Sequence, residues 1–282
     1  MRGYEQKQYA LDHRNYAERC AETYSLKKVA NFFKNLLTFT YNYAIIVIVQ
    51  KREVIPMNKK MYCILDTETV GGATKPTGFY HLGGVICDRN GNIVGCFNYL
   101  IAEMLDLIEF DEYAKKNMNL YLQMLQEGTA TLIDTQENAV AMVNALCEYY
   151  NVGVMMAYNS GFDYCKTMCS ELIAEREFID LWLMALECIC QKASYRKFCA
   201  ENGRYNNKGN CKTNAESVFA YLTNTPDYCE EHTALEDSKI ELEIFNACIK
   251  SHKKFTPNCH CFDHPNKWDL FPSCIVEIVE AL

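Results

Sequence analysis

The chain has 282 residues, of which 49% are apolar and 23% are charged, and its formal net charge is −8. This is a globular composition with enough apolar material for one large core or two small ones, and it excludes a disordered, collagen-like or coiled-coil protein. The 16 cysteines have no repeating spacing, and the first 20 residues carry charges where a secretory signal would be apolar. We therefore expect free thiols and a cytoplasmic location.

The first 56 residues differ from the rest in charge. They hold nine lysines and arginines against five acids, a net charge of +4, which leaves −12 for residues 57–282. Residues 32–49 end in an apolar run, which leaves a membrane anchor as one interpretation, although a spanning helix needs roughly 20 mostly apolar residues. In another interpretation, residues 51–54 are encoded by a purine-rich ribosome-binding sequence, translation begins at Met57, and the leader is a mis-called extension. The expected organisation is a leader (1–56), one domain (57–250) and a C-terminal tail (251–282).

Three strands are predicted at the start of the domain. Residues 61–65 are apolar and partly β-branched or aromatic, as in a buried strand. Residues 81–87 and 93–101 are also strand-like, and residues 88–92 between them contain an Asn-Gly turn signal. We expect three antiparallel strands.

Helices and one further strand follow. Asp134 and Glu137 form a capping-box pattern before apolar residues at helical spacing up to Tyr150. Residues 102–133, before this helix, are long and irregular. A buried strand is predicted at 152–157, and apolar spacing predicts helices at 162–175, 179–201, 214–222 and 229–250. The order indicates an α/β sandwich.

Two acids, Asp66 and Glu68, directly follow the first strand. Residues i and i+2 of an extended chain point to the same face, so the two carboxylates project together and repel. A cation between them relieves this repulsion, and oxygen ligands suit Mg²⁺ or Mn²⁺. The alternative is a pair of solvated acids at the mouth of a turn.

Two later segments carry further polar groups. Asp163 follows the strand at 152–157 and a polar turn, which places it at the rim of the sheet; its alternative role is a helix cap. His232 and Asp237 are five residues apart, which is not one face of an ideal helix, so His232 is expected at or just before the helix start. There it can accept a proton near Asp237, or it is a cap or surface group.

Together these segments resemble the DEDDh 3′–5′ exonucleases. The matching stretches are residues 65–69 (Leu-Asp-Thr-Glu-Thr), 159–163 (Asn-Ser-Gly-Phe-Asp) and 232–237 (His-Thr-Ala-Leu-Glu-Asp). The family includes the proofreading subunit of bacterial DNA polymerase III, oligoribonuclease and ribonuclease T. The resemblance covers about residues 60–250, with Asn159 standing where many relatives have histidine. It implies a bacterial or phage source and a ribonuclease-H-like α/β fold, in which helices flank a mixed sheet that opens with three antiparallel strands.

The resemblance also implies a mechanism. Asp66, Glu68, Asp163 and Asp237 would hold two Mg²⁺ ions about 3.5–4 Å apart, with Mn²⁺ as a substitute, and His232 would be the general base. The chain would release nucleoside 5′-monophosphates from a single-stranded DNA 3′ end and could serve a DNA polymerase in trans. The alternatives are an exoribonuclease of the same fold and a non-catalytic nucleic-acid-binding accessory.

An acidic protein that binds a polyanion needs a local basic surface. Residues 191–213 hold six lysines and arginines and one acid, so we expect a backbone-contacting surface there, or else an ordinary solvated loop. Aromatic side chains beside Asp163 could stack on a terminal base or belong to the core. The candidate substrate contacts are Thr67, Thr69, Tyr158, Asn159, Phe162, Arg196, Arg204 and Lys208, with a weaker expectation for the backbone of Gly71.

The C-terminal tail offers a different kind of site. Cys259, His260, Cys261 and His264 lie close together in the sequence. They could form a structural zinc module, although Cys-x-Cys is not the usual spacing. The alternative is a set of loop thiols that merely lie near one another.

Overall fold

The computed structural model describes residues 60–70, 78–108, 112–166, 176–251 and 255–260. The chain divides into two compact units, Met1–Glu53 and Val54–Leu282, and all the described residues belong to the second. The expectations about residues 1–56, Gly71, Cys261 and His264 fall outside this range. None of the helices that the structure describes is both long and apolar enough to cross a membrane.

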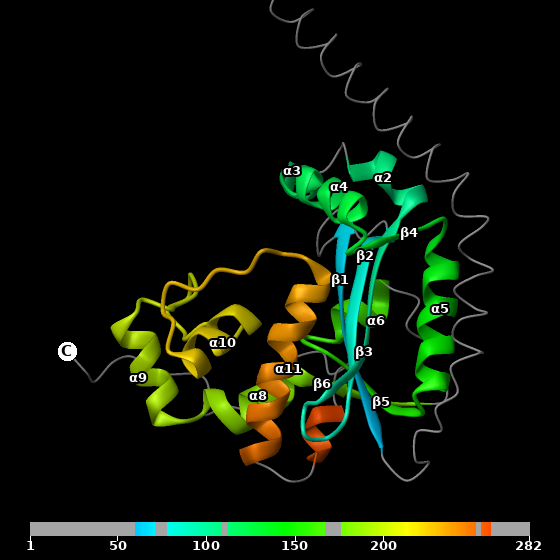
Figure 1. Cartoon of the computed structure of the whole chain (residues 1–282). Coiled ribbons are helices and arrows are strands. Elements are labelled where there is room, and N and C mark those ends of the chain that lie inside the picture. Colours follow the sequence, from blue (N-terminus) through cyan, green and yellow to red (C-terminus); the bar gives the residue numbers. More distant parts are fainter. Residues whose placement is uncertain (1–59, 71–77, 109–111, 167–175, 252–254, 261–282) are drawn as a thin grey trace, which may run out of the picture. The chain divides into compact units, whose positions relative to one another are not determined.

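The centre of the described unit is a six-stranded sheet in the order β4-β3-β2-β1-β5-β6 (Figure 1). Strand β2 runs antiparallel to β1 and β3, whereas the pairs β3–β4, β1–β5 and β5–β6 are parallel. This is the predicted mixed sheet, which opens with three antiparallel strands. The strands are β1 (Met61–Val70), β2 (Gly78–Cys87), β3 (Ile93–Ile101), β4 (Thr131–Ile133), β5 (Val152–Ala157) and β6 (Glu177–Asp180).

The turn between β2 and β3 is formed as the sequence predicts. The carboxylate of Asp88 accepts hydrogen bonds from the backbone of Asn90 (2.8 Å) and Asn92 (3.1 Å). Gly91 has φ of 80°, a left-handed conformation that a residue without a β-carbon adopts at low cost. Local turn chemistry therefore fixes this hairpin.

The predicted helix after β4 begins one residue later than its capping pattern suggests. Helix α5 covers Gln136–Tyr149, and its N-cap is Thr135, whose hydroxyl accepts from the backbone of Asn138 (3.2 Å). Asp134 instead binds the Asn138 side chain at 2.7 Å. The two positions are adjacent, and both residue types are good caps.

Two segments differ more strongly from the prediction. Residues 102–108 and 112–133 are largely regular rather than irregular: they form α2 (Ala102–Ile108), α3 (Glu112–Lys116), α4 (Met118–Glu127) and β4. The single helix predicted at 179–201 instead starts in strand β6 and continues as α8 (Leu181–Ala185), a π-helix (Leu186–Cys190) and α9 (Ala193–Glu201). Buried Asp180 separates β6 from α8 by accepting from the backbone of Trp182 and Leu183. Short apolar strands and buried helices cannot be distinguished by periodicity alone.

The remaining helical elements pack on the sheet or, in the case of α10 (Ala215–Thr223), on α11 (Ala234–Ser251). The others are α6 (Gly161–Lys166) and a 3₁₀ turn (Pro257–His260). Helix α11 packs against β1 and β2 from one side and α5 covers the other (Figure 1). The rings of Tyr62 on β1 and Phe245 on α11 lie 5.2 Å apart in the core. Because side chains alternate along a strand, Asp66 and Glu68 continue the face of β1 that carries Tyr62.

The first turn of α11 lies directly on the backbone of β2. A β-carbon on Gly83 would overlap the backbone of Ala234 and Leu235. The Ser238 hydroxyl, one turn further along, donates to the carbonyl of Gly83 at 3.1 Å. Glycine at position 83 thus sets how closely α11 approaches the sheet.

We predict that Gly83→Ala lowers the free energy of unfolding by about 2 kcal/mol, because the helix must shift away from the strand. Gly153→Ala is the matched control on β5, since a β-carbon there meets only the Lys60 side chain at ordinary distances of 3.4 and 3.5 Å. We expect the control to change stability by less than about 1 kcal/mol. Urea unfolding followed by circular dichroism measures both, and equal stabilities for the two variants would contradict the close contact.

Candidate metal centre

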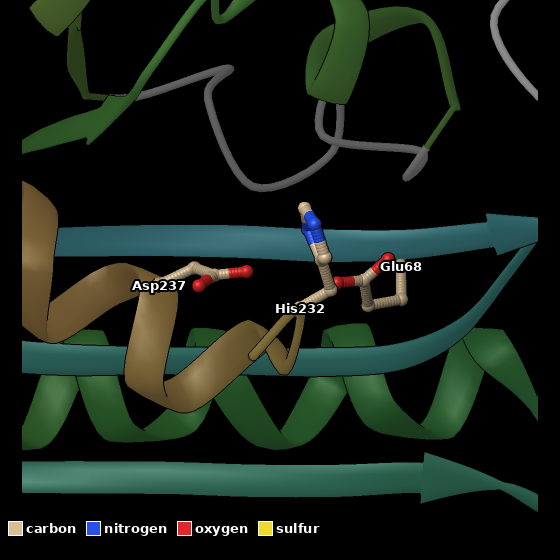
Figure 2. A group of neighbouring side chains, drawn as sticks. All are labelled: Glu68, His232 and Asp237. Atoms are coloured by element: carbon tan, nitrogen blue, oxygen red, sulfur yellow. The ribbon is translucent and has the colours of Figure 1, made fainter. Parts of the chain in front are cut away.

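Three potential metal ligands meet near the C-terminal end of strand β1, beside the start of α11. Glu68 lies on β1, His232 lies two residues before α11, and Asp237 lies in its first turn (Figure 2). One ligand atom from each lies within 4.8 Å of the others, and no other group of this kind occurs among the residues that the structure describes. Segments more than 160 residues apart in the sequence thus supply one small site.

Asp66 and Asp163 belong to the same cluster. Asp66 precedes Glu68 by two residues on β1, and Asp163 lies in the first turn of α6. The hydroxyl of Thr67 donates to Asp163 Oδ1 at 2.6 Å and so ties α6 to β1. The charge of Asp66 acts on both Asp163 and Asp237. Of the five residues that the sequence analysis placed in the catalytic set, Glu68, His232 and Asp237 thus form one group, and Asp66 and Asp163 lie near enough for their charges to act on it.

Burial and mutual repulsion make these carboxylates resist ionisation. Desolvation raises the pKa of Asp66 to about 7, and desolvation together with Asp66 and other acids raises that of Glu68 to about 9. The pKa of Asp237 rises to about 10 for the same reasons, with Asp66 the largest neighbouring charge. The pKa of Asp163 also lies well above its usual value because of its burial and the charge of Asp66. Without a cation, the cluster holds protons at neutral pH.

The donor set fits a divalent cation. Asp237 is only 8% exposed, and its Oδ1 atom is buried without a hydrogen-bond partner. An unsatisfied buried oxygen is rare in folded proteins and is commonly explained by an ion or a water. Several carboxylate oxygens converging on one point match the ligand preference of Mg²⁺ and Mn²⁺.

The backbone of His232 is held by helix α4. Its φ of 55° is left-handed, which is costly for a non-glycine residue and needs support from the surrounding structure. Asn117 Nδ2 and the Tyr121 hydroxyl each lie 3.3 Å from the His232 carbonyl oxygen and donate to it. These contacts hold the imidazole beside Glu68 and Asp237.

A buried histidine, His81, fixes the start of α11. It lies opposite Glu68 across the β1–β2 pair. One ring nitrogen contacts Asn98 Oδ1 at 2.6 Å, and Nδ1 accepts from the backbone of Ala234 at 3.4 Å. Desolvation lowers the pKa of His81 to about 4, so it is neutral and can serve as donor to Asn98 and acceptor from Ala234.

The position of Arg204 differs from the exposed loop that we expected. Arg204 is only 8% exposed. Its guanidinium group donates hydrogen bonds to Glu216 at 2.8 Å and to the carbonyls of Pro226 and Tyr228 at 2.5 and 2.8 Å. Glu216 in turn accepts from the backbone of Glu230 at 3.3 Å. Arg204 therefore anchors the segment that leads to His232 and is not available to contact a nucleic-acid backbone.

Tyr158 is also committed within the protein. Its hydroxyl donates to the carbonyl of Thr213 at 2.5 Å, and its ring packs against the core. Asn159 is exposed, with φ of 60°, and its backbone donates to Asp180. Phe162 is half-buried in the first turn of α6, beside Asp163. Of the two candidate stacking aromatics, Phe162 is the one next to Asp163 in the same helix, whereas the hydroxyl of Tyr158 is hydrogen-bonded within the protein.

The basic segment remains largely on the surface apart from Arg204. Arg196 is half-buried and donates to the carbonyl of Gln191 at 2.8 Å, and Lys208 is exposed in the turn at 206–210. Thr67 is buried, whereas Thr69 is half-buried on β1. The other exposed cations of the segment are Lys192, Lys197 and Lys212.

Sequence reasoning missed two acids that belong to the neighbourhood of the site. Glu241 lies four residues after Asp237, hence on the same face of α11, and this spacing could have indicated it. Glu230 lies two residues before His232, and no local pattern distinguishes it. Desolvation, with Glu216 and Asp66, raises the pKa of Glu230 to about 7. Both side chains have a buried oxygen without a hydrogen-bond partner.

Cys259, the thiol suggested as a zinc ligand, is not part of the group of potential metal ligands among the described residues. Cys259 is buried in the core and contacts the Thr256 hydroxyl at 3.5 Å, while His260 faces Glu177 at 3.6 Å. The two neighbours in sequence thus have different surroundings. Eleven cysteines of the described ranges, Cys259 among them, are free thiols.

Similar known proteins were found only among solved structures, because no family model and no curated protein matches the chain. Escherichia coli exonuclease I in complex with a dA16 oligonucleotide is 15% identical, with a TM-score of 0.43 over 76% of this chain and 45% of that chain. The 3′-exonuclease that recognises the histone mRNA stem-loop is 10% identical, with a TM-score of 0.45 over 78% of this chain and 73% of its own. The match to exonuclease I thus spans less than half of that protein.

The raised pKa values predict how stability depends on pH. Between their ordinary values (3.8 for Asp, 4.5 for Glu) and folded values of about 7 to 10, Asp66, Glu68 and Asp237 bind protons in the folded protein that the unfolded chain has lost. Stability then falls as pH rises through this window.

In the presence of a chelator we expect the melting temperature to fall between about pH 5 and pH 9. Millimolar Mg²⁺ or Mn²⁺ should reduce this slope by binding the ionised acids, and Asp237→Asn should reduce it in the chelator alone. Thermal unfolding at a series of pH values measures the effect. A melting temperature that rises over this range in the wild type would show that the acids are not mutually repelling.

Proposed function

We propose that the chain is a metal-dependent 3′–5′ exonuclease that releases nucleoside 5′-monophosphates from a nucleic-acid 3′ end. The observation that carries the proposal is the meeting of Glu68, His232 and Asp237 within 4.8 Å, with Asp66 and Asp163 in the same cluster. Four acids and one histidine from three separate segments of the chain make up the proposed site. A purely structural role does not account for so many unneutralised carboxylates, which destabilise the fold.

In this proposal, Asp66, Glu68, Asp163 and Asp237 hold Mg²⁺ or Mn²⁺. The bound cations would acidify a water molecule and stabilise the departing 3′-oxygen. His232 is half-buried beside these acids, where it can take the proton of the attacking water. Glu68 would also accept a hydrogen bond from the terminal 3′-hydroxyl, which explains action from an end.

The substrate strand would lie near the half-buried ring of Phe162, whose face is suited to stacking on a terminal base. Thr69 and Asn159 are the accompanying backbone contacts, since both lie at the same strand ends as the acids. Arg196 and Lys208 would contact phosphates further along. Arg204 and Tyr158 are left out because their polar groups bind within the protein.

Single-stranded DNA is the substrate we propose first, and an RNA 3′ end is the second candidate. Discrimination between them depends on contacts to one 2′-hydroxyl. Proofreading for a DNA polymerase in trans remains an expectation of the family resemblance. A non-catalytic accessory is less favoured because all five residues of the catalytic set lie together.

We predict that Asp66→Ala lowers the turnover number by at least about 10³-fold while the fold is retained, because it removes a proposed ligand of the cations that activate the water. The measurement is the release of labelled mononucleotides from an oligonucleotide that carries its label at the 3′ end, in the presence of Mg²⁺. Exposed Glu127→Ala is the control. Near-native turnover of Asp66→Ala would reject the metal-dependent mechanism, and substrates of single-stranded DNA, duplex DNA and short RNA identify the preferred polymer.

A second prediction concerns the basic segment. Charge reversal in Arg196→Glu with Lys208→Glu should raise KM severalfold, leave kcat nearly unchanged and reduce the dependence of KM on salt, because phosphate contacts release counterions. Arg204→Glu is unsuitable, since it would break the buried pair with Glu216. Initial rates at several NaCl concentrations provide the measurement. Unchanged KM and salt dependence would remove this surface from the proposed substrate path.

A further inference from the structure

Glu241 is a buried acid that the mechanism above does not use. It lies on α11, one turn after Asp237, and is 2% exposed. Its Oε2 atom is buried and has no hydrogen-bond partner. Glutamate is rarely buried to this degree without a partner.

Glu241 lies four residues after Asp237, so the two side chains project from the same face of α11. Both are buried, and each has a carboxylate oxygen without a hydrogen-bond partner. Apart from burial, the charges of Asp66, Asp163, Asp237 and Glu230 act on Glu241, and they raise its pKa well above the usual value. The first three come from β1, α6 and α11, the elements that build the candidate metal centre.

An unpaired buried carboxyl requires a physical explanation. The four neighbouring charges with the largest effect on it are all acidic. Its neighbours are acids, which accept hydrogen bonds when ionised and repel a second carboxylate. A cation attracts all of these groups at once, and it explains the unpaired oxygens of both Glu241 and Asp237.

We propose that Glu241 is an inner carboxylate of the cation site, which binds a divalent cation directly or through one bound water molecule. This inference rests on the metal centre of the proposed function and extends it with a residue outside the four-acid set. The ligand class is a hard divalent cation, Mg²⁺ or Mn²⁺, because the new donor is again a carboxylate oxygen.

Titration calorimetry of the full chain with MnCl₂ tests the proposal without reference to activity. We expect Glu241→Gln to weaken Mn²⁺ binding about tenfold or more, since loss of a supporting carboxylate commonly costs 10–100-fold in metal affinity. Glu243→Gln is the matched control on the same helix, because Glu243 is exposed. Its Mn²⁺ affinity should equal that of the wild type.

A thermal measurement gives a second, opposite-signed readout. Without metal, Glu241→Gln should raise the melting temperature, because it removes a group that is repelled by its neighbours; with saturating Mn²⁺, the metal-induced gain should be smaller than in the wild type. Glu241→Met, which fills a similar volume, replaces the glutamine variant if that variant does not fold. Unchanged Mn²⁺ affinity and unchanged metal-induced gain in the folded variant would overturn the assignment.

The outcomes separate this inference from the proposed function. If Mn²⁺ binds tightly and depends on Glu241, while no nucleic acid is hydrolysed, the exonuclease assignment fails and the cation site remains. If nucleotides are released by the wild type and Glu241→Gln binds Mn²⁺ like the wild type, the exonuclease assignment stands and Glu241 is excluded. Absence of Mn²⁺ binding by the wild type contradicts both.

Discussion

The contact between the first turn of α11 and the backbone of β2 is the constraint on which the site depends. Because Gly83 has no β-carbon, Ala234 and Leu235 rest on the strand itself. The Ser238 hydroxyl and the His81 ring bind across the same junction. This seating places Asp237 opposite the acids of β1, and it fixes His232 because that residue immediately precedes the helix.

The acids that gather at this junction oppose folding. Each is partly or fully removed from water and repelled by the others, which is why their pKa values are raised. The rest of the unit must supply the compensating free energy, and the core of β1, β5, α8 and α11 is where apolar side chains are buried. Functional sites with clustered acids commonly lower the stability of the fold, and a cation that binds only the folded state would raise it again.

The parts of this structure that were predictable are those with local signals. The strand pattern at 61–65, the Asn-Gly turn at 88–92 and the helical spacing after Thr135 each depend on neighbouring residues, and each element formed close to its predicted place. The relation between Asp66 and Glu68 followed from strand alternation alone. Their meeting with Asp163 and His232 was expected from a family resemblance, since sequence separation says nothing about distance in space.

The parts that sequence reasoning did not reach depend on tertiary contacts. Arg204 resembles a loop cation until its partners are known, and those partners, Glu216, Pro226 and Tyr228, lie 12 to 24 residues away. Strand β6 is only four residues long, with apolar residues at its two central positions alone, so no strand periodicity separates it from the helix that follows. Helix α4 gave no sign that it would bind the His232 carbonyl, because a side chain that donates to a distant backbone atom has no sequence signature.

The wide separation of the site residues along the sequence also determines when the candidate metal centre can form as the chain is made. Glu68, Asp163 and Asp237 are contributed by the early, middle and late parts of the domain, and contacts of such long range form slowly. During synthesis, the carboxylates cannot assemble before α11 has left the ribosome. A nascent chain that has made only its sheet therefore lacks His232 and Asp237 and cannot form the candidate metal centre.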